Sequence, residues 1–312
     1  MLTTYTTQQL ETLAPHAISD ELEQGHIVGF DPCPVPLPKH DDMRFLLEEL
    51  PWRLKLKNIS YHWESDRVYG FRGTTQETAR ITQILKEHSY HVQEFLRRVI
   101  SHLIQGWVVA TCSFRPIEEQ GRNLPAHASN ELVHIDAGAY GATHGDRILR
   151  FFVNINPSRD RVWITKGTFP EIYARWGEAA GVAPPKLLTE GPLQRLYTGV
   201  LRGLSKFMPP VQFMDSSPYD RTMRRFHNFM KDSLVFQQSL EGHQEFRFKP
   251  YVAWMAFTDM VSHACISGQF AFVSTFIIPL RNCRHPELSP FYILQYGPSG
   301  VIATPGSRPT TT

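Results

Sequence analysis

Two segments with strand-type patterning, separated by a long segment with helical patterning, constrain the fold of this chain more than any other feature. Residues 107–114 (WVVATCSF) are rich in β-branched and aromatic residues, and strand-type patterning continues as far as Asn156. The same patterning returns in residues 246–279, whereas residues 170–238 have helical periodicity, which includes residues 219–236. Strands grouped in this way favour a sheet sandwich with supporting helices over alternating β–α–β units.

The N-terminal third of the chain is predicted to be mainly helical. Helices are expected over the first 25 residues, over residues 40–50 and over residues 75–105, where apolar residues recur at helical spacing. A short strand is expected over residues 25–30. Residues 31–38 must be extended, because prolines at alternate positions are incompatible with a helix.

These patterns predict a chain of three parts. Residues 1–106 are expected to form an N-terminal helical support region. Residues 107–297 are expected to form a mainly β core with a helical insert at about 170–240, followed by a flexible tail over residues 298–312. The predicted fold class is therefore α+β, mainly β with helices. The chain has no GxGxxG or P-loop motif, which argues against nucleotide-binding architectures.

Composition narrows the class of protein further. Of the 312 residues, 42% are hydrophobic and 20% are charged, which is typical of a globular protein with a substantial core. The formal net charge of +2 is too small to indicate nucleic-acid binding. The sequence shows neither a signal-peptide pattern nor an apolar run of about 18 residues, and its four cysteines form no CxxC pair. We therefore expect a cytoplasmic protein with free thiols, no transmembrane segment and no nucleic-acid partner.

The pattern His-x-Asp is the first candidate for a metal site. Two histidines and one carboxylate can hold iron(II) on one face and leave other coordination positions open. On a strand, residues i and i+2 point to the same side, so His134 and Asp136 would face one way while Val133 and Ile135 face the core. By itself this spacing fits a structural pair better than a metal site. His-x-Asp or His-x-Glu also begins at five other histidines: His40, His62, His144, His243 and His285.

Sequence context favours His134 over the other histidines and supplies a third ligand. His40 opens a predicted helix, and His144 lies among glycines that are typical of a turn. His263 lies in the late strand-type segment and is the candidate for the third ligand. Its rival is His227, whose surroundings have helical patterning that favours a histidine at the edge of the core.

Several longer motifs occur in order along the chain: residues 111–116 (TCSFRP), 134–136 (HID), 145–157 (GDRILRFFVNINP), 219–227 (YDRTMRRFH), 257–264 (FTDMVSHA), 267–271 (SGQFA) and 275–276 (TF). From about residue 107 to residue 297, the chain resembles a divergent member of the 3-deoxy-D-manno-oct-2-ulosonic acid (Kdo) hydroxylase family. The resemblance implies a double-stranded β-helix core of the jelly-roll, cupin-like type. It also implies an iron(II)- and 2-oxoglutarate-dependent dioxygenase that hydroxylates C3 of the Kdo sugar of lipid A, with dioxygen as cosubstrate and with His134, Asp136 and His263 as metal ligands.

An arginine that faces the interior of the core is expected to bind the far carboxylate of 2-oxoglutarate, because its two-pronged guanidinium suits a carboxylate. The stretch after His263, residues 264–279, contains neither Arg nor Lys, so the arginine must come from elsewhere. Strand alternation places Arg150 and Asn154 on one face. Arg150 is the first candidate for cosubstrate binding, and Asn154, Thr275 and Arg161 are further candidates. Alternatively, Arg150 lies at a strand end, exposed or paired with Asp146.

An acidic substrate, either a small molecule or a lipid-linked sugar, would need cations in its pocket. Arg221, Arg224 and Arg225 are weak candidates, because such a cluster is more often a solvated helix face. Transient contact with the inner membrane surface is compatible with a lipid-linked substrate. Three alternatives stay open: the same chemistry on another small molecule, a non-catalytic metal-binding β-sandwich, and a zinc hydrolase with Glu131 as its base.

Overall fold

The computed structural model describes residues 1–50, 58–138, 141–185 and 217–298, which form two β-sheets with helices around them. The strands are β1 (Leu2–Tyr5), β2 (Ile27–Phe30), β3 (Ile59–His62), β4 (Arg67–Tyr69), β5 (Val108–Arg115), β6 (Arg147–Asn154), β7 (Arg161–Thr165), β8 (Gln244–Phe248), β9 (Ala253–Phe257), β10 (Ala264–Ser267) and β11 (Ala271–Ile278). The α-helices are α1 (Thr7–Thr12), α2 (Ala17–Glu23), α3 (His40–Arg44), α4 (Thr75–Val99), α5 (Phe169–Trp176), α7 (Pro218–Asp232), α8 (Leu234–Gln238) and α9 (Pro290–Tyr296). Shorter helical turns are η1 (Phe45–Glu49), η3 (Ala126–Ala128), η5 (Leu280–Asn282) and η6 (Pro286–Leu288).

The two predicted β blocks interleave in the large sheet, whereas in the small sheet two strands of the second block flank β7, which lies beyond the predicted end of the first block at Asn156. The eight-stranded sheet has the order β1-β2-β9-β6-β11-β5-β3-β4, and the three-stranded sheet has the order β10-β7-β8. At the centre of the large sheet, β11 pairs antiparallel with β6 on one side and with β5 on the other. In this register Thr275 lies opposite both Arg150 and Thr111. Strands from the two blocks therefore share one core, although the helical insert separates them in the sequence.

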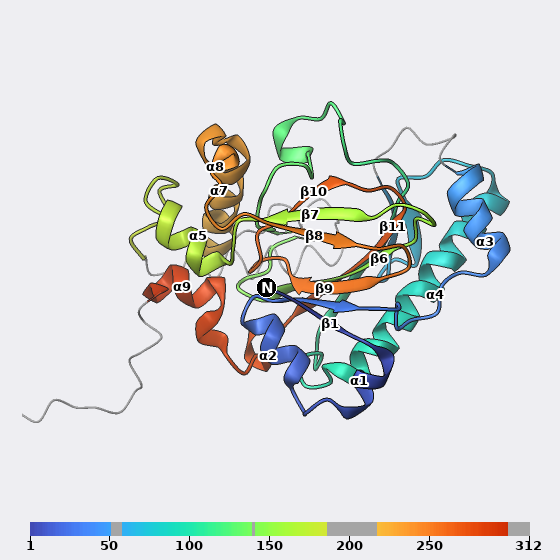
Figure 1. The fold of residues 1–312 in the computed structure, drawn as a ribbon, viewed down its shortest axis with the longest axis horizontal. Coiled ribbons are helices and arrows are strands. Elements are labelled where there is room, and N and C mark those ends of the chain that lie inside the picture. The colour runs from blue at the N-terminus through green and yellow to red at the C-terminus, as the bar shows by residue number, and fades with distance from the viewer. Residues whose placement is uncertain (51–57, 139–140, 186–216, 299–312) are drawn as a thin grey trace, which may run out of the picture.

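Alternate residues of the central strands pack into two different hydrophobic cores. Phe151 of β6 faces the helices, and its ring centroid lies 6.0 Å from that of Phe30. Phe152 faces the small sheet, where its ring meets the edge of Trp163 and stacks on Trp254. Each fully buried side chain of this size contributes roughly 1.5–3 kcal/mol to folding. The second core lies between the sheets, and helices α5, α7 and α8 gather at one end of the small sheet (Figure 1).

Helix α4 packs against the large sheet on the side away from the small sheet (Figure 1). It begins with a capping box in which the Thr74 side chain accepts a hydrogen bond from the Glu77 backbone N–H. The helix ends at Val99, short of the predicted end at Gln105. Its buried apolar residues recur at helical spacing, as predicted: Ile81, Ile84, Leu85, Val92, Phe95 and Leu96.

The N-terminal third contributes strands that the sequence does not predict. Residues 2–5 are predicted to be helical but form β1, because they pair in parallel with residues 27–30 of β2. Pairing of this kind outweighs local propensity in so short a segment. The β3–β4 hairpin is also unpredicted, and Ile59 of β3 lies opposite Phe114 of β5. Together with the predicted strand β2, the unpredicted strands β1, β3 and β4 extend the large sheet at its two edges. The region before residue 107 is therefore more than a helical support.

The predicted helical insert contains α5, α7 and α8, and residues 186–216 of it lie outside the described residues. The predicted flexible tail lies outside them from residue 299 onwards. Among the helices of the described segments, none is long and apolar enough to span a membrane.

Candidate metal centre

The two segments that carry the candidate ligands are joined by a reciprocal pair of backbone hydrogen bonds. The His134 N–H donates to the His263 carbonyl at 3.1 Å, and the His263 N–H donates to the His134 carbonyl at 2.8 Å. The segment around His134 is extended but forms only this bridge, where the sequence predicts a strand. The predicted alternation is nevertheless present, because Val133 and Ile135 lie in the core. The two histidines therefore face each other across the bridge.

The structure brings His134, Asp136 and His263 together. Each offers a ligand atom within 4.8 Å of the other two, and all three are buried. Nε2 of His134 lies 3.7 Å from Oδ1 of Asp136, and Nε2 of His263 lies 3.9 Å from Oδ2. The Nδ1 atoms of the two histidines lie 2.7 Å and 3.0 Å from the carbonyls of Leu132 and Val261. A proton on each Nδ1 can donate to these carbonyls and leaves the Nε2 lone pair for a metal.

The electrostatics of this group fit a divalent cation. Burial lowers the pKa of His134 and of His263, which favours the neutral imidazole that a metal requires. Burial would raise the pKa of Asp136, but the neighbouring Arg150 guanidinium holds it well below its usual range. Nη2 of Arg150 lies 3.3 Å from Oδ2 of Asp136, and this buried oxygen accepts no hydrogen bond from any described residue. Two neutral imidazoles and an ionised carboxylate are a donor set that suits iron(II).

His227, the rival third ligand, lies beside this group without joining it. Its ring centroid is 5.1 Å from that of His134. Its Nδ1 lies 2.7 Å from the Ile135 carbonyl, and burial lowers its pKa. Helix α7 thus places His227 in the wall of the adjoining cavity and not among the three converging ligands.

The candidate ligands line a cavity of about 300 Å³. Trp163 forms an apolar wall and stacks on the His263 imidazole, with ring centroids 5.0 Å apart. The lining also includes four side chains of basic residues: Arg115, Arg150, Arg161 and Lys231. A cavity of this size with convergent basic groups suits a small anionic ligand beside a metal.

The four residues predicted to bind the cosubstrate separate into two pairs. Arg150 and Arg161 line the cavity, whereas Asn154 and Thr275 are not among its lining residues. Nδ2 of Asn154 donates to the backbone carbonyls of Phe248 at 2.9 Å and of two other residues. Its amide therefore ties together the loops at the end of β6.

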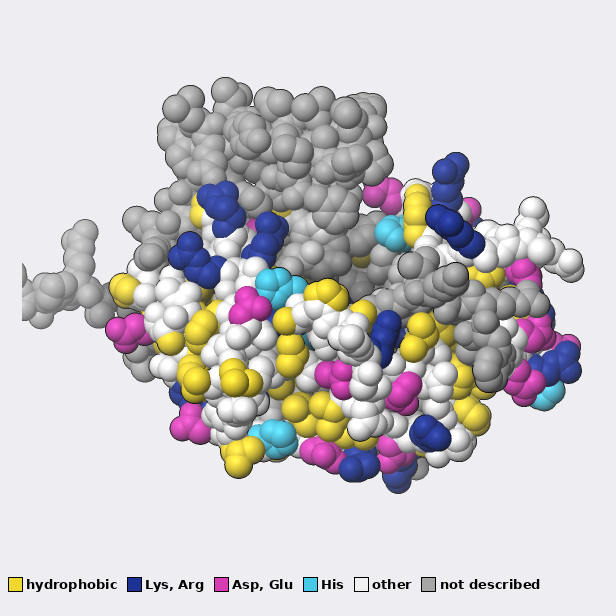
Figure 2. All heavy atoms as spheres, turned by 90° about the horizontal axis from the view of Figure 1, so that it is seen from above, with side chains coloured by type: hydrophobic (Ala, Val, Ile, Leu, Met, Phe, Trp, Pro, Cys, Tyr) yellow, Lys and Arg dark blue, Asp and Glu magenta, His cyan; other side chains and the backbone are white. Residues whose placement is uncertain are grey.

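The three predicted substrate arginines lie on the protein surface. Arg221, Arg224 and Arg225 are exposed on α7 and do not line the cavity. Nη1 of Arg225 donates to the Gly181 carbonyl at 3.3 Å. Figure 2 shows Lys and Arg side chains spread over one face of the molecule with Asp and Glu side chains among them. The arrangement matches a solvated helix face.

Arg115 and Lys231 line the cavity but are not predicted from the sequence. Arg115 ends β5 and alternates with Phe114, which is buried in the core. Strand alternation could therefore have indicated the direction of the Arg115 side chain. Lys231 lies near the end of α7, and no motif marks it.

A buried His-Asp-His group on two segments joined by a backbone bridge, with open space and cationic side chains beside it, defines the class of mononuclear non-heme iron oxygenases that use a 2-oxo acid. The sequence model of the 3-deoxy-D-manno-oct-2-ulosonic acid (Kdo) hydroxylase family matches residues 6–296, so the chain belongs to this family.

Solved structures of the Kdo hydroxylase KdoO are similar to this chain. KdoO is described as a non-heme Fe(II) alphaketoglutarate-dependent dioxygenase, and its complex with alphaketoglutarate and Fe(III) is 27% identical, with a TM-score of 0.76 and 94% of each chain covered. The cobalt(II) complex is 28% identical, with the same TM-score and coverage. No curated protein matches the chain. These findings confirm the predicted family, the α+β fold class with its cupin-like core, and the iron(II)/2-oxoglutarate-dependent dioxygenase class.

Proposed function

We propose that the chain hydroxylates a C–H bond of an acidic sugar, C3 of the Kdo unit of lipopolysaccharide, with iron(II), 2-oxoglutarate and dioxygen. The observation that carries this proposal is the convergence of His134, Asp136 and His263 on a cavity lined with basic side chains. The similar structures are described as those of a Kdo hydroxylase, which supports the choice of sugar.

In this proposal His134, Asp136 and His263 hold the metal on one face. Iron(II), when bound together with 2-oxoglutarate, supplies the activation of dioxygen that hydroxylation of a carbon atom requires. The chain keeps the two imidazoles neutral by burial and orients them through the Leu132 and Val261 carbonyls. It keeps Asp136 ionised through the neighbouring positive charge of Arg150.

We assign the carboxylates of the cosubstrate to Arg150 and Arg161, which both line the cavity. A guanidinium can donate two parallel hydrogen bonds to a carboxylate. Phe152 and Trp163 form the apolar side of the same cavity, where they limit the access of water to the metal. Asn154 and Thr275 have no part in this assignment.

The remaining basic side chains suit the carboxylate of a sugar acid. Nζ of Lys231 donates to the His127 and Ser129 carbonyls at 3.1 Å and 2.8 Å, which holds its charge at the cavity wall. A lipid-linked sugar is found at a membrane surface, so the proposal includes a cytoplasmic protein that contacts the inner membrane surface transiently. Exposed basic residues of α7 are candidates for contact with the anionic remainder of such a substrate: Arg221, Arg224 and Arg225.

The zinc hydrolase alternative lacks a base beside the metal among the described residues. Oε1 of Glu131 accepts a hydrogen bond from the Gly121 N–H at 2.9 Å, and Glu131 does not line the cavity. A hydrolase would need a carboxylate directed at a metal-bound water.

Mass spectrometry of lipopolysaccharide core from cells with and without the protein tests the substrate. We expect one added oxygen atom on Kdo in cells that make the wild-type protein and none in cells that make His134→Ala. If purified protein releases succinate in an iron-dependent reaction while Kdo keeps its mass in cells, the oxygenase chemistry stands and the substrate assignment is wrong.

A further inference from the structure

Helix α8 and the residues just after it carry apolar side chains that project into solvent. Leu234 is 67% exposed, Val235 is 69% exposed and Leu240 is 81% exposed. We call these three residues the α8 patch. The other exposed large hydrophobic side chains of the described segments are spread along the chain: Met1, Tyr69, Tyr90, Val108, Tyr251 and Tyr296. Single exposed apolar residues are ordinary, whereas a local group of them marks an interaction surface.

The α8 patch stands on a rigid base. Phe236 is fully buried in the large hydrophobic core. Nζ of Lys166 donates to the carbonyls of Phe236 and Gln237 at 2.8 Å and 2.9 Å. The Gln237 side chain accepts a hydrogen bond from the Val133 N–H at 3.0 Å and donates one to the Val133 carbonyl at 2.9 Å. Because Val133 precedes the candidate ligand His134, these bonds hold α8 in a fixed position relative to the metal centre.

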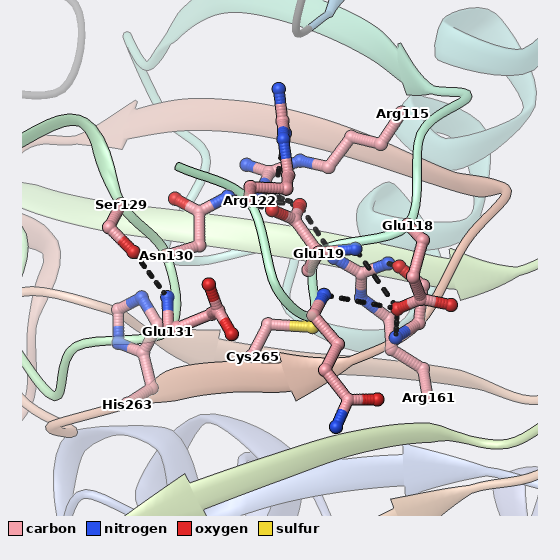
Figure 3. Close-up of polar contacts among 12 residues, drawn as sticks. Arg115, Glu118, Glu119, Arg122, Ser129, Asn130, Glu131, Arg161, His263 and Cys265 are labelled. Carbon is pink, nitrogen blue, oxygen red and sulfur yellow. Dashed lines mark hydrogen bonds and ion pairs between the residues drawn. The ribbon is translucent and has the colours of Figure 1, made fainter. Parts of the chain in front are cut away.

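The α8 patch begins beside the opening of the metal cavity. His127 of η3 lines the cavity and is also half-exposed, so this part of the cavity wall reaches the protein surface. Nε2 of His127 lies 2.8 Å from Oδ1 of Asp232, which is two positions before Leu234. Asn130, in the loop after η3, lines the same cavity as the candidate ligand His263 (Figure 3). The patch therefore lies next to the route by which a large substrate would enter.

Helix α7, which packs beside α8 (Figure 1), adds positive charge to this end of the molecule. Arg221, Arg224 and Arg225 are exposed, and their spacing places them on one face of α7. The two carboxylates of α7 lie elsewhere: Asp220 is buried, and Asp232 pairs with the histidine of η3. Apolar side chains flanked by arginines are complementary to an anionic lipid surface, because the headgroups attract the arginines and the layer beneath accepts the apolar groups.

A second copy of the chain fits the α8 patch less well than a lipid surface does. A stable interface between two protein chains buries roughly 800 Å² on each partner, and the patch has only three apolar side chains. A symmetric pair of copies would also bring the arginines of the two α7 helices near each other, which is unfavourable. A small apolar group next to a basic group instead supplies the two signals that reversible attachment to a bilayer uses.

We propose that the α8 patch inserts into an anionic lipid surface while the arginines of α7 contact its headgroups, so that the cavity opens toward the bilayer. The inference rests on the proposed function and deepens it, because a lipid-linked sugar is presented at such a surface. The rigid base of α8 then holds the candidate metal ligands at a fixed height above the lipid. The sugar can enter the cavity while its lipid stays in the bilayer.

Sedimentation of the full chain, loaded with iron(II), with lipid vesicles tests this surface. One set of vesicles contains phosphatidylethanolamine and phosphatidylglycerol, and the other contains phosphatidylcholine alone. The triple variant Leu234→Ser, Val235→Ser and Leu240→Ser should bind the anionic vesicles roughly tenfold more weakly than the wild type. Tyr69→Ser with Tyr90→Ser is the matched control, because it removes exposed apolar groups from β4 and α4. This control should change the affinity less than about twofold.

Replacing the three arginines of α7 by glutamine should weaken binding to the anionic vesicles and leave binding to phosphatidylcholine unchanged. Failure of the wild-type protein to bind anionic vesicles, or equal binding by the wild type and the triple variant, overturns the inference. A change from dimer to monomer in the triple variant, measured by sedimentation equilibrium, also overturns it, because the patch would then be an interface between copies.

Turnover separates docking from chemistry. With a soluble Kdo glycoside, the triple variant should release succinate within about twofold of the wild-type rate, and with lipid-linked Kdo in vesicles roughly tenfold more slowly. Equal losses with the two substrates overturn the inference. Thermal melting reports folding. Leu240→Ser alone replaces a triple variant that fails to fold, with an expected loss of vesicle affinity of roughly threefold.

The inference and the proposed function can fail separately. If the wild-type protein hydroxylates neither form of Kdo but the triple variant loses vesicle binding, the proposed function fails and the docking surface stands. If the wild-type protein hydroxylates Kdo and vesicle binding is insensitive to the α8 patch, only the docking surface fails.

Discussion

His88 should make the stability of this fold sensitive to mild acid. The residue lies on α4 beneath the large sheet, and its ring centroid is 4.4 Å from that of Phe272. Neither ring nitrogen has a hydrogen-bond partner among the described residues. Burial, with a smaller contribution from nearby His91, lowers the pKa of His88 to about 3. The folded protein therefore keeps the His88 imidazole neutral at ordinary pH, because burial penalises its charged form.

The size of the effect follows from the difference between the folded and unfolded pKa. Above about pH 6.5, the ordinary pKa of histidine in the unfolded chain, His88 is neutral in both the folded and the unfolded state. In this range His88 does not make the free energy of unfolding depend on pH. As the pH falls below this value, the unfolded chain takes up a proton that the folded chain excludes. Each pH unit then lowers the free energy of unfolding by up to about 1.4 kcal/mol, until the pH approaches 3. Between pH 7.5 and pH 5.0 the expected loss from His88 is about 2 kcal/mol.

Urea unfolding at pH 7.5 and pH 5.0 measures this loss. His88→Leu replaces the imidazole by an apolar group of similar volume that does not titrate. From pH 7.5 to pH 5.0, the free energy of unfolding of the variant should therefore fall by about 2 kcal/mol less than that of the wild type. His91→Leu, on the same helix and partly exposed, is the matched control. Other charged groups near His88 line a neighbouring cavity and are unchanged in both variants: Lys39, Asp42 and Glu87. An equal acid-induced loss in wild type and His88→Leu would refute the reasoning.

Other substitutions test the metal centre and its cavity. His134→Ala and His263→Ala should each abolish iron-dependent succinate release, while His227→Ala should keep most of it; the opposite result for the last two would move the third ligand to His227. Arg150→Ala should raise the 2-oxoglutarate concentration needed for half-maximal succinate release far more than the iron concentration needed, and equal increases would indicate a folding role. Trp163→Ala should cost about 3–5 kcal/mol of stability in urea, because it empties the core between the sheets; a cost below about 1 kcal/mol would contradict the described packing.

Local pattern was sufficient to predict that His134 and Asp136 project together, because period-two alternation depends on the backbone alone, whereas their role as metal ligands followed from the family resemblance. Val133 and Ile135 are buried, as alternation predicts, so His134 and Asp136 project together to the other side. The choice of His263 as the candidate third ligand followed from its strand-type surroundings. The strand expected around His134 is absent, yet extended backbone with one bridge is enough to produce the same alternation.

Residues whose roles depend on distant segments could not be predicted in this way. Alternation placed Asn154 on the same face as Arg150, but two of the three backbone carbonyls that accept hydrogen bonds from its amide, those of Phe248 and Lys249, lie nearly a hundred positions later. Glu119, in the loop after β5, meets Arg161 of β7 only when these two segments pack together. Likewise, residues 2–5 form a strand only because they pair in parallel with β2. In each case the decisive partner is remote in sequence and leaves no local periodicity.

The reciprocal backbone hydrogen bonds between His134 and His263 have a consequence for how such a protein can change. They close a loop that contains the entire insert, and the entropy of closing a loop grows only slowly with its length. The insert within that loop can therefore change in length and sequence, and so alter which molecules the cavity admits, while the spacing of the two imidazoles stays the same. The residues that would hold the metal and the insert that would select the substrate can therefore vary independently, because the bridge between His134 and His263 fixes only the first of them.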